Sequence, residues 1–205
     1  MTPDSTHHLD HFEALYAASD DPWNVRGAWY EQRKRAVLLA SLAKPRYRSG
    51  FEPGCGNGEL SVALAARCER LLASDGAASA VAAARRRMQH LAHTPPCQLH
   101  IEQRCLPHDW PIGSRFDLIV ISELAYYFDQ AALARMIGAA RDCLAPDGEL
   151  LMCHYLPPFD DRITATEPAH GIAHATPGLS HTLQHRDRLF MLDVWQCAPQ
   201  PGAAP

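Results

Sequence analysis

The sequence lacks the features that define several classes of protein. No apolar run approaches the ~20 residues that a helix needs to cross a bilayer, and the polar start, Met1 to Asp10, has no apolar signal segment. The formal net charge of −4 gives no overall attraction for nucleic acid. The seven cysteines are odd in number and never spaced as C-x-x-C, which is typical of free thiols in a reducing compartment. We therefore expect a cytoplasmic protein with no membrane and no nucleic-acid partner.

What is present suits a compact α/β domain. A chain of 205 residues, 47% of them apolar, is long enough to bury a core. Helical and strand patterns alternate along it, which predicts a single doubly wound, Rossmann-like domain with a mostly parallel sheet, a terminal antiparallel strand pair and helices on both faces. We expect a helical lid at 1–45, the core at 46–197 and a disordered tail at 198–205. Helices are predicted at 8–18, 29–42, 58–68, 77–91 and 130–144, and strands at 48–52, 70–75, 98–104, 116–121, 149–156, 181–186 and 189–196.

A glycine-rich turn is the most informative motif. The segment FEPGCGNG at 51–58 follows the first predicted strand and opens a helix, and Asp75 ends the next strand. Glycines let the backbone turn sharply and approach a ligand closely, and the helix N-terminus presents free N–H groups at the same place. An acid at the end of the second strand can accept hydrogen bonds from ribose hydroxyls. The arrangement therefore predicts a nucleoside cofactor, the alternative being a plain turn between strand and helix.

The glycine spacing decides between two cofactors. A dinucleotide fingerprint reads G-x-G-x-x-G, whereas Gly54, Gly56 and Gly58 alternate here, with Glu52 two residues before the first. A carboxylate at this place repels a pyrophosphate and suits a cationic amino group. This E-x-G-x-G-x-G pattern resembles the first motif of class I S-adenosylmethionine (SAM) methyltransferases. It disfavours an NAD-dependent oxidoreductase.

Further motifs extend the resemblance over nearly the whole chain. The apolar run 116–122 followed by Glu123, and LAPDGELL at 144–151, are similar to segments found throughout that superfamily. The combination of DPW at 21–23, WYE at 29–31 and SELAYYF at 122–128 resembles, more specifically, the nodulation-type (NodS-like) N-methyltransferases. Their known member methylates the free amine of a partly deacetylated chitin oligosaccharide. The resemblance implies SAM as cofactor, S-adenosylhomocysteine (SAH) as product and a small-molecule acceptor, such as an amino sugar.

The resemblance also implies which residues bind the cofactor. The loop would hold the methionine part and Asp75 the ribose. The sequence departs from the superfamily after the third strand, where an aspartate usually contacts adenine and where Cys105 and Leu106 stand instead, with Asp109 further on. The cofactor-binding residues that we expect are Trp23, Tyr30, Glu52, Gly54, Cys55, Gly56, Asp75, Gly76, Cys105, Leu106, Ser122 and Glu123. For Trp23 and Tyr30, simple packing of the N-terminal helices is the alternative to a lid.

Methyl transfer to an amine needs few catalytic groups. Most of the acceleration can come from alignment, but the amine must be neutral to attack, so a carboxylate or imidazole beside it can accept its proton. Glu123 follows the fourth strand and His154 lies late in the fifth, at the edge where such folds bind ligands. We expect these two to be catalytic. The alternatives are that Glu123 caps a turn or holds the cofactor, and that His154 is a hydrogen-bonded histidine at a strand end.

The remaining candidates concern the acceptor. Tyr126 and Tyr127 offer aromatic faces for adenine or a sugar, unless they are simple core residues, and His170 lies in a segment, 157–178, that is predicted to be an irregular loop beside the site. Three alternatives stay open for the protein: a small-molecule O-methyltransferase, a non-catalytic SAM-binding protein and a nicotinamide enzyme. The sequence does not predict an oligomeric state.

The twelve histidines raise the question of a metal. His170 and His174 are four residues apart, as are His181 and His185. The first pair has Gly171 inside it and prolines on either side, and the second lies in a predicted strand, where such residues stand ~13 Å apart. No H-E-x-x-H or Cys/His cluster occurs. We therefore expect no metal-dependent catalysis.

Overall fold

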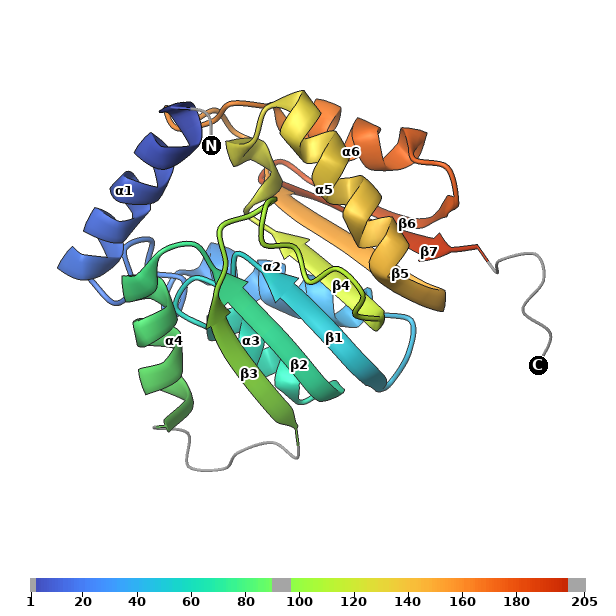
Figure 1. Ribbon diagram of the computed structural model, residues 1–205, viewed down its shortest axis with the longest axis horizontal. Helices are drawn as coiled ribbons and strands as arrows, with labels where there is room; N and C mark the ends of the chain where they lie inside the picture. Colours follow the sequence, from blue (N-terminus) through green and yellow to red (C-terminus); the bar gives the residue numbers. More distant parts are fainter. Residues whose placement is uncertain (1–2, 90–96, 199–205) are drawn as a thin grey trace. The chain divides into compact units, whose positions relative to one another are not determined.

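The protein is represented by a computed structural model, which describes residues 3–89 and 97–198. In these residues the strands form a seven-stranded sheet in the order β3-β2-β1-β4-β5-β7-β6 (Figure 1). The pairs β2–β3, β1–β4 and β4–β5 are parallel, whereas β5–β7 and β6–β7 are antiparallel. The predicted Rossmann-like sheet with a terminal antiparallel pair is confirmed.

The helices are α1 (Pro3–Ala18), α2 (Trp29–Ala40), α3 (Glu59–Ala65), α4 (Ala78–Gln89), the short 3-10 helix η1 (Ala125–Tyr127), α5 (Gln130–Cys143) and α6 (Thr166–Ala175). The strands are β1 (Tyr47–Pro53), β2 (Cys68–Asp75), β3 (Gln98–Gln103), β4 (Phe116–Ser122), β5 (Leu144–Tyr155), β6 (Leu179–Arg186) and β7 (Phe190–Cys197). Residues 90–91 of the predicted fourth helix and residues 199–205 of the predicted tail lie outside the described residues. The division into lid, core and tail stays a prediction.

The chain's contacts group into two units, which are described separately below. The first comprises residues 1–47 and 52–105, and the second comprises residues 48–51 and 106–205. The strand β1 therefore contributes its last residues, which lead into the glycine loop, to the first unit.

The first unit is packed around small side chains. One face of α4 buries three alanines and a valine, and these small side chains let the helix pack closely against its neighbours. A core cluster joins Cys55 of the glycine loop to Ala73 of β2 and Ala84 of α4, with Leu99 and Ile101 of β3 against it. This apolar packing holds the glycine loop in place.

The second unit follows the apolar pattern of the sequence closely. Leu118 to Ile121 of β4 are almost fully buried, as expected of a central strand covered on both faces. In α5, helical periodicity places Leu133, Met136, Ile137 and Ala140 on one face, and all four are buried. Leu144, predicted to end that helix, instead begins β5.

The prediction of an irregular loop over 157–178 is wrong, because residues 166–175 form α6. Pro168 is the third residue of this helix, and proline is tolerated in the first turn, where its missing N–H would have no intrahelical partner. Gly171 lies inside the helix, but a Cβ added there would meet nothing within 4 Å, so it marks no close approach. Within residues 3–89 and 97–198, no helix combines the length and the apolarity that a membrane span requires.

Candidate active site

The loop after β1 has backbone dihedral angles that glycine alone adopts easily. Gly54, Gly56 and Gly58 all have positive φ angles, of 72°, 53° and 78°. A Cβ on Gly56 would collide with the hydroxyl oxygen of Tyr16, and one on Gly58 would lie 3.0 Å from the Cβ of Ala84. The three predicted loop positions therefore need glycine for conformation, and two of them also need it for space.

Asp75 ties the end of β2 to this loop. Its Oδ2 accepts a hydrogen bond from the Gly56 N–H at 2.9 Å, and its Oδ1 accepts one from the Ala77 N–H at 3.0 Å. Burial raises the pKa of Asp75, and these backbone donors offset part of the rise. An ionised carboxylate has about four lone-pair positions, so Asp75 keeps capacity to accept hydrogen bonds from a ligand. The Cys55 N–H also reaches the end of β2, donating to the Ser74 carbonyl at 2.9 Å.

Glu52 is a buried acid with an unused oxygen. Its side chain lies at the end of β1, and the residue is 2% exposed. Burial raises its pKa to about 8, with a further rise from Asp75 and a partial offset from the neighbouring Ser61 hydroxyl. Among the described residues, no group donates a hydrogen bond to its Oε2. A cation beside this carboxylate would restore the ionised form, which is the chemistry predicted for Glu52.

The thiol of Cys55 is not a nucleophile in this setting. Cys55 is buried, and burial raises the pKa of its thiol, with further contributions from Asp75 and Glu52. The thiol therefore stays protonated at neutral pH. What Cys55 offers a ligand from this loop is its backbone.

The helix α1 covers the glycine loop. The carboxylate of Glu13 accepts hydrogen bonds from the Ser79 N–H at 3.2 Å and thereby fixes α1 to the first turn of α4. Leu9 would collide with a Cβ on Gly76, as Tyr16 would with one on Gly56. The sequence predicted this helix but not what it packs against, because the residues that it contacts lie tens of positions away.

Trp23 and Tyr30, the predicted lid residues, both lie in the first unit. The ring of Trp23 contacts Tyr16 and Phe12 edge-on or tilted, at 5.5 and 6.2 Å between centroids, and the residue remains 45% exposed. Tyr30 is half-buried, and the ammonium of Lys34 lies 5.0 Å from its ring centroid. Trp23 therefore packs with the aromatic residues of α1, of which Tyr16 lies against the glycine loop.

The predicted adenine contacts, Cys105 and Leu106, follow β3. Cys105 is half-buried and takes part in no disulfide among the described residues. The Arg104 N–H just before it donates to the Asp75 carbonyl at 2.9 Å, and Gln103 donates to the Gly76 carbonyl at 2.9 Å. The end of β3 is thus fixed to the end of β2, beside the acid. Leu106 belongs to the second unit.

In the second unit, Glu123 follows Ser122 at the end of β4 in a strained conformation. Its φ angle is 53°, which is uncommon for a residue with a side chain. Its N–H donates to the Cys153 carbonyl at 2.9 Å. Its Oε2 accepts from the Tyr126 hydroxyl at 2.5 Å and from the Tyr155 N–H at 3.0 Å. Such strain is often found at functional sites, and the two donors hold the carboxylate in one orientation.

Tyr126 and Tyr127 form an aromatic cluster beside Glu123. Their rings meet edge-on at 4.7 Å, Phe159 packs on both, and the Arg162 guanidinium lies 5.4 Å from the Tyr126 centroid. Tyr126 is 4% exposed, whereas Tyr127 is half-buried. Burial raises the pKa of Tyr127, and Glu123 adds to the rise. Tyr127 is therefore the ring of this pair that an acceptor can reach more easily.

His154 belongs to a buried hydrogen-bonded chain. Its Nε2 accepts from the Ala125 N–H at 3.0 Å, so its proton lies on Nδ1 and is donated to Nε2 of His170 at 2.9 Å. Nδ1 of His170 then donates to Oδ2 of Asp193 at 2.7 Å. His154, His170 and Asp193 are each at most 1% exposed.

These placements favour structural roles for both histidines. Each ring nitrogen of His154 and of His170 faces a protein group in the chain just described. For His154 this is the alternative of a hydrogen-bonded histidine at a strand end. The catalytic role predicted for His154 and the acceptor contact predicted for His170 stay untested.

The comparisons with known proteins agree with this geometry. The family model for Nodulation protein S (NodS) matches residues 2–155. The Nodulation protein S of Rhizobium tropici is 35% identical over 136 residues, which are 65% of this chain and 55% of that protein. The chain thus spans about half the length of that relative.

Two solved structures show the fold. A Pseudomonas syringae protein described as a candidate methyltransferase is 43% identical, with a TM-score of 0.71 over 82% of this chain and 99% of that one. The N-methyltransferase NodS of Bradyrhizobium japonicum WM9, in complex with SAH, is 22% identical, with a TM-score of 0.78 over 92% of this chain and 97% of that one.

The sheet order and the glycine loop therefore define a Rossmann-like domain of the class I SAM-dependent methyltransferase type. Within that class, the chain belongs to the Nodulation protein S family. Both predictions made from the sequence motifs are confirmed.

Proposed function

We propose that the protein is a SAM-dependent N-methyltransferase whose acceptor is an amine on a sugar or another small molecule. The observation that carries the proposal is the first unit's combination of three left-handed glycines, a buried Glu52 and a backbone-anchored Asp75. The family membership supports it, as does the fold shared with an N-methyltransferase crystallised with SAH.

The residues present fit SAM. The Glu52 oxygen that lacks a described donor suits a cationic amino group, and the glycine loop presents backbone N–H groups without Cβ atoms. The spare acceptor capacity of Asp75 suits ribose hydroxyls. Trp23, with α1, would exclude water. When bound, SAM supplies an electrophilic methyl group.

We propose that groups of the second unit bind and deprotonate the acceptor. The Glu123 carboxylate, held by Tyr126 and the Tyr155 N–H, would bind the protonated amine and then accept the proton that the amine must lose to become a nucleophile. Tyr127 offers a half-buried ring on which a sugar face can pack. Orientation supplies the remaining acceleration. We propose no proton transfer through His154.

The decisive experiment measures transfer of an isotopically labelled methyl group from SAM to a panel of acceptors. Glucosamine oligosaccharides with one free amine are compared with their fully N-acetylated forms, whose amide nitrogens are not nucleophilic, so that only hydroxyls remain as acceptors. Labelling of the free-amine compounds alone, lost in Glu123→Gln, supports the proposal. Labelling of the acetylated compounds at oxygen would instead identify an O-methyltransferase. SAH binding without transfer to amines or hydroxyls would identify a SAM-binding protein.

A further inference from the structure

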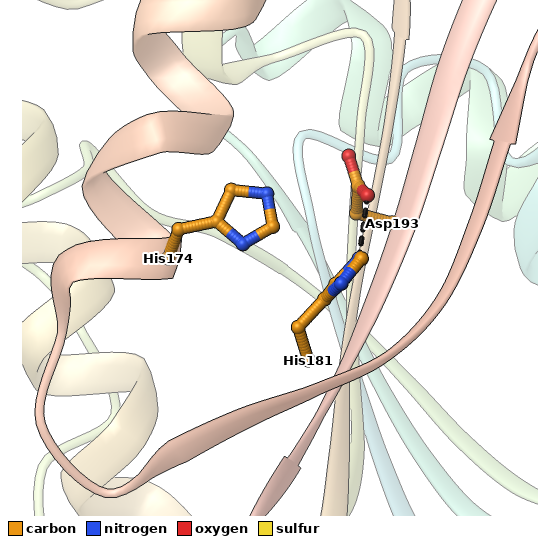
Figure 2. Close-up of side chains that lie close together, drawn as sticks. All are labelled: His174, His181 and Asp193. Carbon is orange, nitrogen blue, oxygen red and sulfur yellow. Dashed lines mark hydrogen bonds and ion pairs between the residues drawn. The ribbon is translucent and has the colours of Figure 1, made fainter.

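Three side chains that the proposed methyl transfer does not use gather in the second unit. His174 lies near the end of α6, His181 on β6 and Asp193 on β7, and Figure 2 shows the His174 ring directed toward the other two. One ligand atom from each lies within 4.8 Å of the others. The sequence pairs His170/His174 and His181/His185 did not reveal this group, because each histidine joins a residue of another element.

The donor set is two imidazoles and one carboxylate. Oδ1 of Asp193 accepts from Nε2 of His181 at 2.7 Å and from Nε2 of Gln184 at 3.0 Å. The other oxygen, Oδ2, accepts from His170. This leaves Oδ1 as the oxygen that faces His181, while His170 fixes the orientation of the carboxylate. A ligating group oriented by a hydrogen bond from an outer residue is a regular feature of metal sites.

The spacing suits a small tetrahedral cation after a modest movement. Bonds of about 2.0–2.1 Å in tetrahedral geometry place ligand atoms about 3.3 Å apart. His181 and Asp193 are already closer than this, and the widest separation in the group, up to 4.8 Å, must close by about 1.5 Å. Both histidines are exposed, on a helix end and on the edge strand β6, and their rings already meet edge-on at 4.5 Å between centroids, with Trp195 packed against both.

Two existing hydrogen bonds must be exchanged, the one between His181 and Asp193 and a second one at His174. Nδ1 of His174 accepts from the indole N–H of Trp195 at 3.3 Å, which places the His174 proton on Nε2, the nitrogen that Figure 2 shows toward Asp193. Coordination through Nε2 moves that proton to Nδ1 and ends the bond from Trp195. At 3.3 Å the bond lies beyond the usual range for N–H donors, so little is lost.

We propose that His174, His181 and Asp193 bind one divalent transition-metal ion of the zinc type, with water as the fourth ligand. Nitrogen and oxygen donors in this number favour zinc over magnesium or calcium, which prefer oxygen ligands alone. The ion would join α6 to β6 and β7 and replace the hydrogen bond between His181 and Asp193. It adds a structural cation site and takes no part in methyl transfer.

The test uses the full chain without an affinity tag, freed of metal by a chelator. Zinc is titrated calorimetrically, and cobalt(II) is titrated with its visible absorption as a report of tetrahedral geometry. We expect one ion per chain, a tetrahedral cobalt spectrum and a higher unfolding temperature with zinc. His174→Gln and His181→Gln, both at exposed positions, should each weaken binding at least tenfold.

The matched control is His185→Gln, on the same strand as His181, which contacts Asp187 at 3.4 Å instead. It should bind zinc as the wild type does. The proposal is overturned if the folded wild type binds no stoichiometric ion. It is equally overturned if binding survives in both exposed variants or is lost only when cysteines are replaced. The buried hydrogen-bond network would then be complete without a metal.

Discussion

Glu52 provides the sharpest test of the cofactor site. Its pKa rises from an ordinary value of 4.5 to about 8 because burial disfavours the charged form. Between these two values the folded protein keeps the proton and the unfolded chain loses it, so the free energy of unfolding falls as pH rises. The slope is about 1.4 kcal/mol per pH unit.

The change to make is Glu52→Gln, which keeps the shape and removes the titration. From pH 5.5 to pH 8 the wild type should lose about 3 kcal/mol relative to this variant, by the same slope. Urea unfolding at four pH values measures the difference. Glu69→Gln, which removes an exposed carboxylate of β2, is the control and should follow the wild type. Parallel pH profiles for wild type and Glu52→Gln would refute the buried, protonated Glu52.

The same group links pH to cofactor binding. The ammonium group of SAH favours the ionised carboxylate, so binding below pH 8 must release the Glu52 proton. The affinity should therefore rise by up to tenfold per pH unit between pH 5.5 and 7.5 and level off above pH 8. Calorimetry in two buffers of different ionisation enthalpy counts the released proton. An equal pH dependence in Glu52→Gln would show that the ammonium group lies elsewhere.

Three further predictions test other parts of the account. Gly56→Ala would be strained, because the φ angle at this position is 53° and the added Cβ would collide with Tyr16. It should lower the free energy of unfolding, measured in urea, by about 1–3 kcal/mol and weaken SAH binding at least tenfold. Unchanged binding would place the ligand away from the loop. Tyr126→Phe removes a hydrogen-bond donor to Glu123. It should lower kcat/KM for the amine about tenfold and leave the SAH dissociation constant unchanged. An equal loss of kcat/KM and of SAH affinity would indicate general damage to the fold. His170→Ala interrupts the buried hydrogen-bonded chain from His154 to Asp193. It should lower the free energy of unfolding, measured in urea, by about 2–4 kcal/mol. A decrease below about 0.5 kcal/mol would mean that these hydrogen bonds add little to stability.

Much of the fold was predictable because local patterns agreed with tertiary burial. The apolar run at 118–121 forms a buried central strand, and the buried residues of α5 follow the periodicity of the predicted helix. The helix α6 was missed because Pro168 and Gly171 are usually breakers, although one falls in a tolerant first turn. Local propensity cannot show that a neighbouring sheet stabilises such a segment.

The sequence could name those residues of the candidate site that follow the ends of predicted strands. Glu52, Asp75 and Glu123 were named from their positions after apolar runs. The contacts of these three residues could not be named from the sequence, because the residues that contact them come from distant parts of the chain. Tyr16 packs on a glycine 40 positions later, and Asp193, the end of the buried histidine chain, carried no signal in sequence. Long-range packing decides these contacts.

The measurement that tests the central claim most directly is calorimetric titration of the folded protein with SAH, with Asp75→Asn as the control. The account predicts one site per chain and at least tenfold weaker binding in the variant, equivalent to about 1.4 kcal/mol. Asp75→Asn keeps only one of the two oxygens that accept from the Gly56 and Ala77 N–H groups, so urea unfolding must show that the variant is folded before the loss is assigned to the ligand. Absence of binding in the folded wild type, or equal binding by both proteins, would contradict the assignment of a SAM site to this loop.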